Sequence, residues 1–245
     1  MFEGEKENLA RFQGRIPDEL PLLTGNVVGP PQPVSSGGVN ATKKLALDTG
    51  LEAFHKPTAG VEVATARHYG HHEEAPTINE CAAWRLACEL GDRVTDLLPV
   101  CVFQEYAGQE GSLCADAGGW PRDTDPLSDP KWCLPAGFWD SLIGQQDRHG
   151  GNWRWDGHRL TLIDHGYCFP LPGHILNYSE FVKARHQDHH APALEAWEQE
   201  ALERLVASPS LFGIVAVVPV DRANAMSDRA KTMLGRGQIL GLGEF

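Results

Sequence analysis

The sequence is short of positive charge. Its 245 residues include 21 Lys and Arg against 33 Asp and Glu, which gives a formal net charge of −12. An acidic surface repels phosphate backbones and anionic lipid headgroups, so we expect no nucleic-acid partner. No apolar run approaches the ~20 residues that cross a bilayer, and the charged start MFEGEKENLARF lacks the apolar stretch of a signal peptide. We therefore expect a cytoplasmic protein with no integral membrane segment.

Metal and redox motifs are also missing. The six cysteines form no C-x-x-C pair, which argues against a zinc ribbon or a redox motif and favours reduced, mostly buried thiols. The histidine-rich stretches HHEE (71–74) and HQDHH (186–190) lack the H-E-x-x-H pattern of zinc hydrolases. We interpret both stretches as solvated polar surface.

The order of the predicted elements, with strands first and helices later, indicates an α+β chain. Two alternating strands flank a turn at 48–50, which predicts a hairpin. Residues 78–90 have helical periodicity, Thr77 and Glu80 match a capping box at its start, and Gly91 is placed to end it.

The chain divides into a flexible segment at 1–22, a first lobe at 23–106 and a second lobe at 107–245. The first lobe ends in a buried strand over 97–106, and residues 111–132 are rich in Gly, Pro and Asp and are therefore expected to form a loop. In the second lobe, helical periodicity predicts two helices, over 191–208 and 221–234.

Residues 147–166, DRHGGNWRWDGHRLTLIDHG, gather polar chemistry around one turn. Asp156-Gly157 separates NWRW from HRLTLI, which is a strong β-hairpin pattern. If these two residues form the turn, Asn152 pairs with Thr161 and lies at the open end of the hairpin.

Two aspartates belong to the same open end. Asp164 falls opposite His149, and Asp147 lies in the loop five positions before Asn152. Side chains of directly paired residues are ~5 Å apart, so the Asn152 amide oxygen and the Asp164 carboxylate can share a hard cation such as Mg²⁺. The sequence therefore predicts a metal site at this end of the hairpin.

The motifs D-R-H-G-G-N (147–152) and I-D-H-G (163–166) resemble the catalytic and metal-binding loops of kinases. The first motif is most similar to that of phosphatidylinositol 3- and 4-kinases, whose catalytic loops read D-R-H-x-x-N. The segment LIDHGYCFP (162–170) resembles the D-x-G region of the type II 4-kinases. HipA-type kinases and other bacterial kinase-like phosphotransferases share this arrangement. The resemblance covers about residues 34–170. It implies a two-lobed, protein-kinase-like α+β fold with an antiparallel-sheet first lobe and a mainly helical second lobe.

The resemblance implies an ATP-dependent phosphotransferase that uses Mg²⁺ or Mn²⁺. Asp147 would accept or orient the proton of the acceptor hydroxyl, and Asn152 and Asp164 would hold the metal. His149 is a second candidate for the base, because imidazole titrates near neutral pH. Phosphoryl transfer depends more on positioning than on deprotonation, so we expect Asp147 to matter more.

The resemblance also assigns roles upstream. Lys56 would bind the α- and β-phosphates, and Glu80 would pair with it, with Glu73 and Glu74 as alternatives. The turn SSGGVNATKK would cover the phosphates, although it is neither G-x-G-x-x-G nor a Walker A motif, and the strand end VFQEY would contact adenine. The remaining nucleotide contacts are assigned to Ser36, Gly37, Gly38, Asn40, Gln104, Glu105 and Tyr106.

Two other functions are compatible with the sequence. A metal-dependent hydrolase would use Asp147, His149, Asp164 and His165, but it leaves Lys56 and the glycine turn without a role. A nucleotide-binding regulatory pseudokinase would not need Asp147, Asn152 and Asp164 together. The acceptor is left open between a protein, a small molecule and a lipid, as is the oligomeric state.

Overall fold

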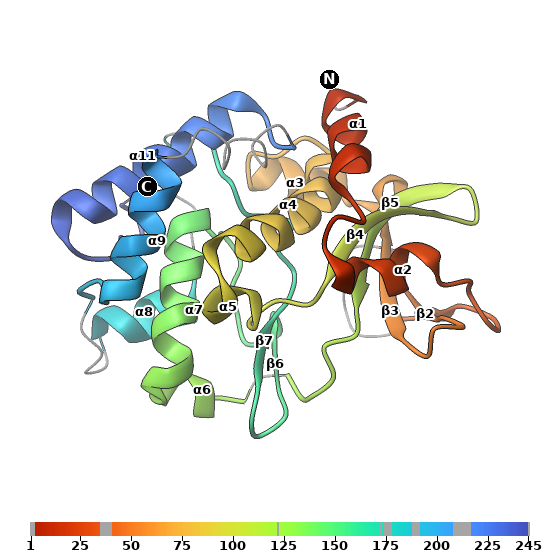
Figure 1. The fold of residues 1–245 in the computed structure, drawn as a ribbon, viewed down its shortest axis with the longest axis horizontal. Helices are drawn as coiled ribbons and strands as arrows, with labels where there is room; N and C mark the ends of the chain where they lie inside the picture. The colour runs from red at the N-terminus through yellow and green to blue at the C-terminus, as the bar shows by residue number, and fades with distance from the viewer. Residues whose placement is uncertain are drawn as a thin grey trace.

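The structure, a computed structural model, describes residues 3–34, 41–121, 123–171, 173, 178–187, 192–207 and 217–244. Figure 1 shows a β-sheet on the right and a group of helices on the left, with α4 running between them. This is the predicted two-lobed α+β arrangement. Among the described residues, no helix combines the length and the apolar character needed to cross a membrane.

The elements are as follows. The strands are β1 (Gln32–Pro33), β2 (Lys43–Ala46), β3 (Glu52–Pro57), β4 (Cys101–Tyr106), β5 (Gln109–Ala115), β6 (Trp153–Trp155) and β7 (Leu160–Leu162). The helices are α1 (Glu3–Phe12), α2 (Leu20–Thr24), α3 (Val63–His68), α4 (Ala75–Leu90), α5 (Asp92–Thr95), α6 (Asp125–Ser128), α7 (Pro130–Ile143), α8 (Glu180–Gln187), α9 (Ala196–Ala207) and α11 (Val220–Arg236), with short 3₁₀ turns at Pro17–Glu19 and Thr58–Gly60.

The sheet of the first lobe is antiparallel and has the order β1-β2-β3-β5-β4. The predicted hairpin at 48–50 is confirmed as β2 and β3, and the Leu47 amide donates to the Leu51 carbonyl at 2.8 Å. Strand β3 lies in the middle of the sheet, between β2 and β5. The backbone of Lys56 pairs with Ser112 of β5, and that of its neighbour His55 pairs with both β2 and β5.

The predicted lobe boundary at 106/107 is wrong, because β4 does not leave the sheet there. The chain turns back at Ala107 and Gly108, which both have positive φ (51° and 74°), and continues as β5. The expected loop over 111–132 therefore holds most of β5, all of α6 and the start of α7. Glycines and prolines suggested a loop here, but strand pairing and the Asp129 cap of α7 order the segment.

The N-terminal segment expected to be flexible is instead helical and packed. Leu9 of α1 and Leu22 of α2 are fully buried. Glu19 between them is also fully buried, and it accepts hydrogen bonds from the Arg85 guanidinium (2.7 Å) and the Trp84 indole (3.2 Å) of α4. The polar residues of this segment suggested a flexible conformation, but contacts with residues some 65 positions away hold it in place.

Helix α4 forms where predicted, but it begins at Ala75 rather than at the expected capping box. The Thr77 hydroxyl donates to the Glu74 carbonyl at 3.1 Å, and Glu80 lies within the helix. Glu80 is therefore released from the capping role and turns toward the site described below. The two later helices are confirmed as α9 and α11.

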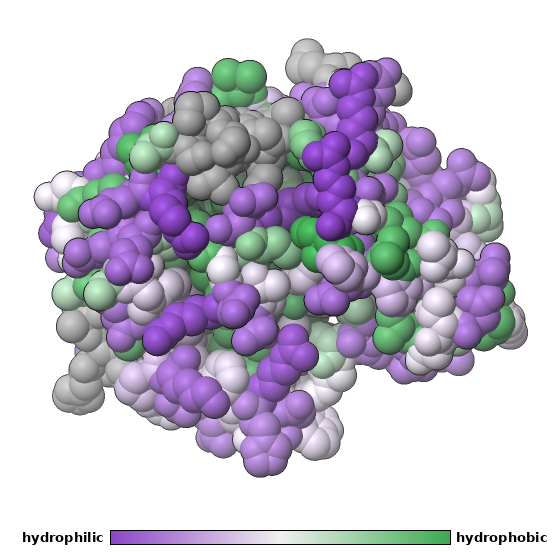
Figure 2. Space-filling view, in the orientation of Figure 1, coloured by the Kyte–Doolittle hydropathy of each residue, from purple (hydrophilic) through white to green (hydrophobic). Residues whose placement is uncertain are grey.

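Two apolar clusters hold the lobes. The larger joins α4, α7, α8, α9, α11 and the β6–β7 hairpin, and its largest fully buried side chains include Trp139 and Trp153. The smaller lies on the other face of the sheet, under α2. Figure 2 shows that most of this face of the molecule is polar, with hydrophobic residues gathered near α1 and α2. All six cysteines are free thiols, and five of them are buried.

The segment between the lobes is attached to the β6–β7 hairpin. Trp120 and Trp155 exchange backbone hydrogen bonds of 2.8 and 3.0 Å. Gly119 has φ +71°, and a Cβ at this position would lie 2.7 Å from the Trp155 carbonyl oxygen. Only glycine fits this close approach of the two backbones.

Candidate active site

Lys56 of β3 joins the two lobes through its side-chain contacts. Its ammonium forms an ion pair with Glu80 of α4 and a second, at 2.9 Å, with Asp164 just after β7. Although burial opposes the charged form, the Asp164 and Glu80 carboxylates raise the pKa of Lys56 well above its ordinary value. The sequence assigned all three residues to one site, and the structure brings them together.

The two carboxylates that contact the Lys56 ammonium differ in exposure: one is buried and the other is open to solvent. Glu80 is 4% exposed, and burial raises its pKa although Lys56 opposes this. Asp164 is 41% exposed, and Lys56 lowers its pKa despite the opposing effect of desolvation. Asp164 is therefore the carboxylate that stays ionised and faces outward, as a metal ligand must.

The backbone at Asp164 is held in an uncommon conformation, with φ +64°. The Gln145 amide donates to the Asp164 carbonyl at 3.0 Å, and the amide of the next residue, His165, donates to Glu80 at 3.1 Å. A left-handed conformation at a residue other than glycine persists only when its surroundings fix it. These contacts fix the direction of the Asp164 carboxylate.

Arg148 is the buried scaffold of the loop. Its guanidinium is fully buried and pairs with Asp140 of α7, which is 1% exposed, through contacts of 3.1 and 3.2 Å. It also donates to the carbonyls of Asn152 (2.7 Å) and Ile163. One side chain thus ties the D-R-H loop to the strand that carries Asp164.

The open end of the hairpin holds Asn152 as predicted, although the predicted register is wrong. Thr161 pairs with Arg154, not with Asn152, and Trp155 pairs with Leu160, so the turn spans four residues. The Asp156 carboxylate accepts from the amides of residues 158 and 159 and so stabilises the longer turn. The register shifts by two residues, which is one full period of a strand, so every side chain keeps its predicted face.

Asn152 and Asp147 are connected within the loop. The Asn152 amide nitrogen donates to the Asp147 carbonyl at 2.5 Å, and the side chain is 5% exposed. Because the side-chain nitrogen of Asn152 is occupied by this hydrogen bond, the side-chain oxygen is the atom that can ligate a cation. Asn152 and Asp164 together supply the oxygen donors that Mg²⁺ or Mn²⁺ accepts.

Asp147 and His149 lie at the rim of the site, where their side chains are 29% and 50% exposed. The His149 Nε2 is 3.9 Å from an Asp147 carboxylate oxygen, and its Nδ1 accepts from the Gly151 amide at 3.0 Å. Burial raises the pKa of Asp147, against the opposing effect of His149. A raised pKa suits a carboxylate that accepts a proton.

The structure adds a residue that the sequence did not suggest. Burial and the charges of Asp147 and Asp164 raise the pKa of Tyr69, at the C-terminal end of α3, to about 12. Its ring stacks on Tyr167, with centroids 4.5 Å apart. Tyr69 belongs to no motif and is distant in the sequence from Tyr167, so only tertiary structure reveals the contact.

The predicted adenine contacts Gln104, Glu105 and Tyr106 are not brought to the site. They lie on the edge strand β4, and Tyr106 points to the face opposite Lys56, where it packs with the α2 cluster and contacts the His55 ring at 5.8 Å. The chain enters the second lobe after β5 instead, through residues 115–119. Ser36, Gly37, Gly38 and Asn40 lie outside the described residues.

His165 is a buried neutral base, not a metal ligand. It is 2% exposed, and its Nε2 accepts from the Trp139 indole at 3.1 Å. Burial, together with the charges of Arg148 and Lys56, lowers its pKa well below the ordinary value. This arrangement removes one of the four residues that the hydrolase alternative requires.

The state of His165 predicts a pH dependence of stability. The unfolded chain binds a proton at this histidine below about pH 6.5 and the folded chain does not, so stability is lost as pH falls below that value, by at most about 1.4 kcal/mol per pH unit. We expect the unfolding free energy, measured in urea between about pH 7 and pH 5, to fall more steeply in the wild type than in His165→Gln. Equal slopes in the two proteins would contradict this protonation state.

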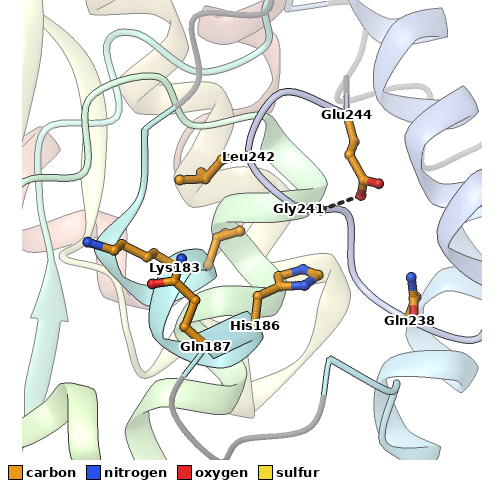
Figure 3. A pocket seen from close by; sticks show the side chains of 8 residues that line it. Lys183, His186, Gln187, Gln238, Gly241, Leu242 and Glu244 are labelled. Atoms are coloured by element: carbon orange, nitrogen blue, oxygen red, sulfur yellow. Dashed lines mark hydrogen bonds between the residues drawn. The ribbon is translucent and has the colours of Figure 1, made fainter.

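The described parts of the two histidine-rich stretches, 71–74 and 186–187, do not form metal sites, and residues 188–190 lie outside the described residues. His71 is buried and pairs with Gln146 at 3.0 Å, so the expectation of solvated surface is wrong for this residue. His186 is exposed and lines a cavity of about 380 Å³ between α8 and the C-terminal segment, with Lys183 and Glu244 (Figure 3). Within the described ranges, no group of three or more His, Cys, Asp or Glu side chains is arranged to hold a metal.

No protein-family model and no curated protein matches this chain, whereas solved structures do. The Golgi casein kinase aligns with a TM-score of 0.59 and 14% identity, over 99% of this chain and 86% of that chain. The same kinase with Mn/ADP bound aligns at 0.58 and 13%, over 96% and 82%. Hydra Fam20 with sugar aligns at 0.50 and 12%, over 91% of each. The chain therefore has the two-lobed kinase-like fold of these proteins.

Proposed function

We propose that this protein is an ATP-dependent phosphotransferase that moves the γ-phosphate to a hydroxyl group. The observation that carries the proposal is the junction at Lys56, which contacts Glu80 and Asp164 at once. In kinases, the lysine–glutamate pair and the metal-binding aspartate must both be in place for phosphoryl transfer. The contacts of Lys56 with Glu80 and Asp164 match this requirement and so support the proposal.

The side chains fit a nucleotide with a divalent cation. Lys56 would contact the phosphates, and Asp164 and Asn152 would hold Mg²⁺ or Mn²⁺. The metal would neutralise negative charge on the β- and γ-phosphates during transfer. The Golgi casein kinase, which shares the fold, has been solved with Mn/ADP bound, and this supports the same pair of ligands here.

Adenine would lie against the backbone of residues 115–119. This segment follows β5 directly, and Asp116 fixes its start by pairing with Lys44 at 2.8 Å. Ser36, Gly37, Gly38 and Asn40, which lie outside the described residues, would cover the phosphates.

The acceptor is a hydroxyl on a protein, a small molecule or a lipid. The likeness of the two motifs to phosphatidylinositol 3- and 4-kinases and to HipA-type kinases supports a kinase of unconventional type. The net charge of −12 disfavours an anionic membrane surface as the place of reaction.

Calorimetric titration with ATP, with and without Mg²⁺, tests the proposal directly. We expect binding that depends on the metal. A titration at millimolar ATP that shows no metal-dependent binding would contradict the function. Binding without transfer to any fraction of a cell lysate in the presence of radiolabelled ATP would favour the regulatory pseudokinase.

The order of importance of Asp147 and His149 is a further prediction. Asp147→Asn should lower kcat about 10²- to 10⁴-fold, the range typical of a general base. His149→Ala should lower it less, because positioning outweighs deprotonation. Steady-state rates of both variants check this. Losses of equal size with nucleotide binding intact would reverse the order.

A further inference from the structure

His71, a buried histidine just before α4, contacts the loop that carries Asp147. Its ring is 3% exposed, and its Nε2 lies 3.0 Å from the side-chain oxygen of Gln146. Gln146 is 2% exposed and is the residue immediately before Asp147. Neither His71 nor Gln146 has a role in the proposed function so far.

The other nitrogen of the His71 ring fixes where its proton lies. The Nδ1 atom is 3.1 Å from a guanidinium nitrogen of Arg222 in α11 and 3.4 Å from the side-chain nitrogen of Asn79 in α4. Both of these nitrogens can only donate. The Nδ1 atom must therefore accept, so the imidazole is neutral and carries its proton on Nε2. That proton is donated to the Gln146 side-chain oxygen.

The two donors that face Nδ1 are held in place by backbone carbonyls. The Arg222 guanidinium donates to the carbonyls of Phe169 and Gly70, both at 2.7 Å. The Asn79 side chain donates to the Gly166 carbonyl at 2.8 Å. The tautomer of the ring is therefore set by α11, by α4 and by the segment that follows the proposed metal ligand.

The backbone of Asp147 is fixed on both sides. After it, the Asn152 side-chain nitrogen donates to the Asp147 carbonyl at 2.5 Å. Before it, the Gln146 amide donates to the Tyr167 carbonyl at 3.2 Å. Within the described ranges, the side-chain nitrogen of Gln146 has no hydrogen-bond partner. The bond from His71 is therefore the one that orients this side chain.

We propose that His71 is a positioning residue for Asp147, and this rests on the proposed kinase function. Its Nε2 proton holds Gln146 and thereby the backbone that directs the Asp147 carboxylate, while Arg222 of α11 keeps the proton on that nitrogen. His71 exchanges no proton with the substrates. Because a misplacement of about 1 Å can lower a rate about 10²-fold, loss of this one hydrogen bond should slow transfer. The residues assigned to the nucleotide and the metal are untouched.

Two substitutions separate the two hydrogen bonds of the ring. His71→Asn places an oxygen near the position of Nδ1, so it keeps the acceptor for Arg222 but has no donor that reaches Gln146. His71→Gln places an amide nitrogen near the position of Nε2, so it keeps the donor to Gln146 but lacks the acceptor for Arg222. A positioning role predicts that only the second variant retains the rate.

The rate is measured on the full chain as release of labelled phosphate from γ-labelled ATP, with Mg²⁺ or Mn²⁺ and water as the acceptor. We expect His71→Asn to lower kcat about 10²-fold and to leave KM for ATP within about twofold of the wild type. His71→Gln should recover most of kcat, although it should unfold at a lower urea concentration than His71→Asn. His72→Asn, the same change at the exposed neighbouring histidine, is the control and should match the wild type.

A double variant tests whether His71 acts through Gln146. Gln146→Leu removes the acceptor of the same hydrogen bond and should lower kcat by a similar factor. The double variant His71→Asn, Gln146→Leu should lose no more than either single variant, because both changes remove one interaction. Losses that multiply would show that the two residues act independently and would overturn the proposed path.

The tautomer is tested on the wild type without any substitution. A nitrogen-15 NMR spectrum of the histidine side chains should show the His71 proton on Nε2. A proton on Nδ1 overturns the inference, whatever the variants do.

The outcomes distinguish this inference from the proposed function. Equal losses of kcat in His71→Asn and His71→Gln, or a larger loss in His71→Gln, overturn the positioning role and leave the kinase function standing. A wild type that neither binds ATP with the metal nor releases phosphate overturns the kinase function, and the positioning role with it.

Discussion

Asp164→Asn is expected to abolish metal-dependent nucleotide binding, with a loss of at least ~100-fold in affinity, equivalent to ~2.8 kcal/mol. Asp164 is the outward-facing carboxylate of the site, and Lys56 holds it ionised. The substitution removes the charge that attracts the cation and one of the two charges that balance Lys56. Asparagine is the appropriate replacement because it tolerates the positive φ of 64° better than alanine does.

Calorimetry in the presence and absence of Mg²⁺ measures the effect. Asp147→Asn is the matched control, since it makes the same chemical change at the rim of the site. It should keep most of the binding and lose transfer. If Asp164→Asn binds ATP and Mg²⁺ as the wild type does, the metal ligand has been assigned to the wrong carboxylate.

Arg148→Met should have the largest effect on stability, a loss of about 3–5 kcal/mol. The change leaves the Asp140 carboxylate buried and without its cation, with Ser179 as a remaining donor at 2.7 Å. It also removes the donor that joins the carbonyls of Asn152 and Ile163. The loop that carries Asn152 and the segment that carries Asp164 then lose their common support.

Urea denaturation measures this loss. Arg93→Met is the control, because Arg93 is 67% exposed and its contact with Glu195 is 3.8 Å long. An exposed pair of this kind contributes little. If both variants unfold at the same urea concentration, Arg148 is not the scaffold of the loop.

Much of the site was predictable because its residues belong to motifs with fixed spacing. Asp147, Asn152 and Asp164 surround one hairpin, and short-range pairing placed them together even with the register two residues out. Lys56 and Glu80 followed from the order of strand and helix. The site residues that could be predicted from the sequence are those whose positions depend on local periodicity and on the order of the elements along the chain.

The parts that were missed depend on contacts between distant segments. Glu19 docks the N-terminus through Arg85, and the Tyr69 ring stacks on Tyr167, which is distant in the sequence. The adenine contacts were misplaced because a buried strand that ends in polar residues does not show whether it turns back or leaves the sheet. The turn at Ala107 and Gly108 decides this, through two successive residues with positive φ.

The backbone pairing of Trp120 with Trp155 limits how the lobes can swing. On one side, the Asp116 amide donates to the Glu52 carbonyl at 2.8 Å and so belongs to the sheet. On the other, Gly119 lies against Trp155 and moves with the hairpin. The segment can therefore pivot only at Ala117 and Gly118. The β6–β7 hairpin, with Asn152 and Asp164 at its open end, lies beyond this pivot. A rotation of the sheet about Ala117 and Gly118 would carry Lys56 away from the hairpin and would part its ammonium from Asp164.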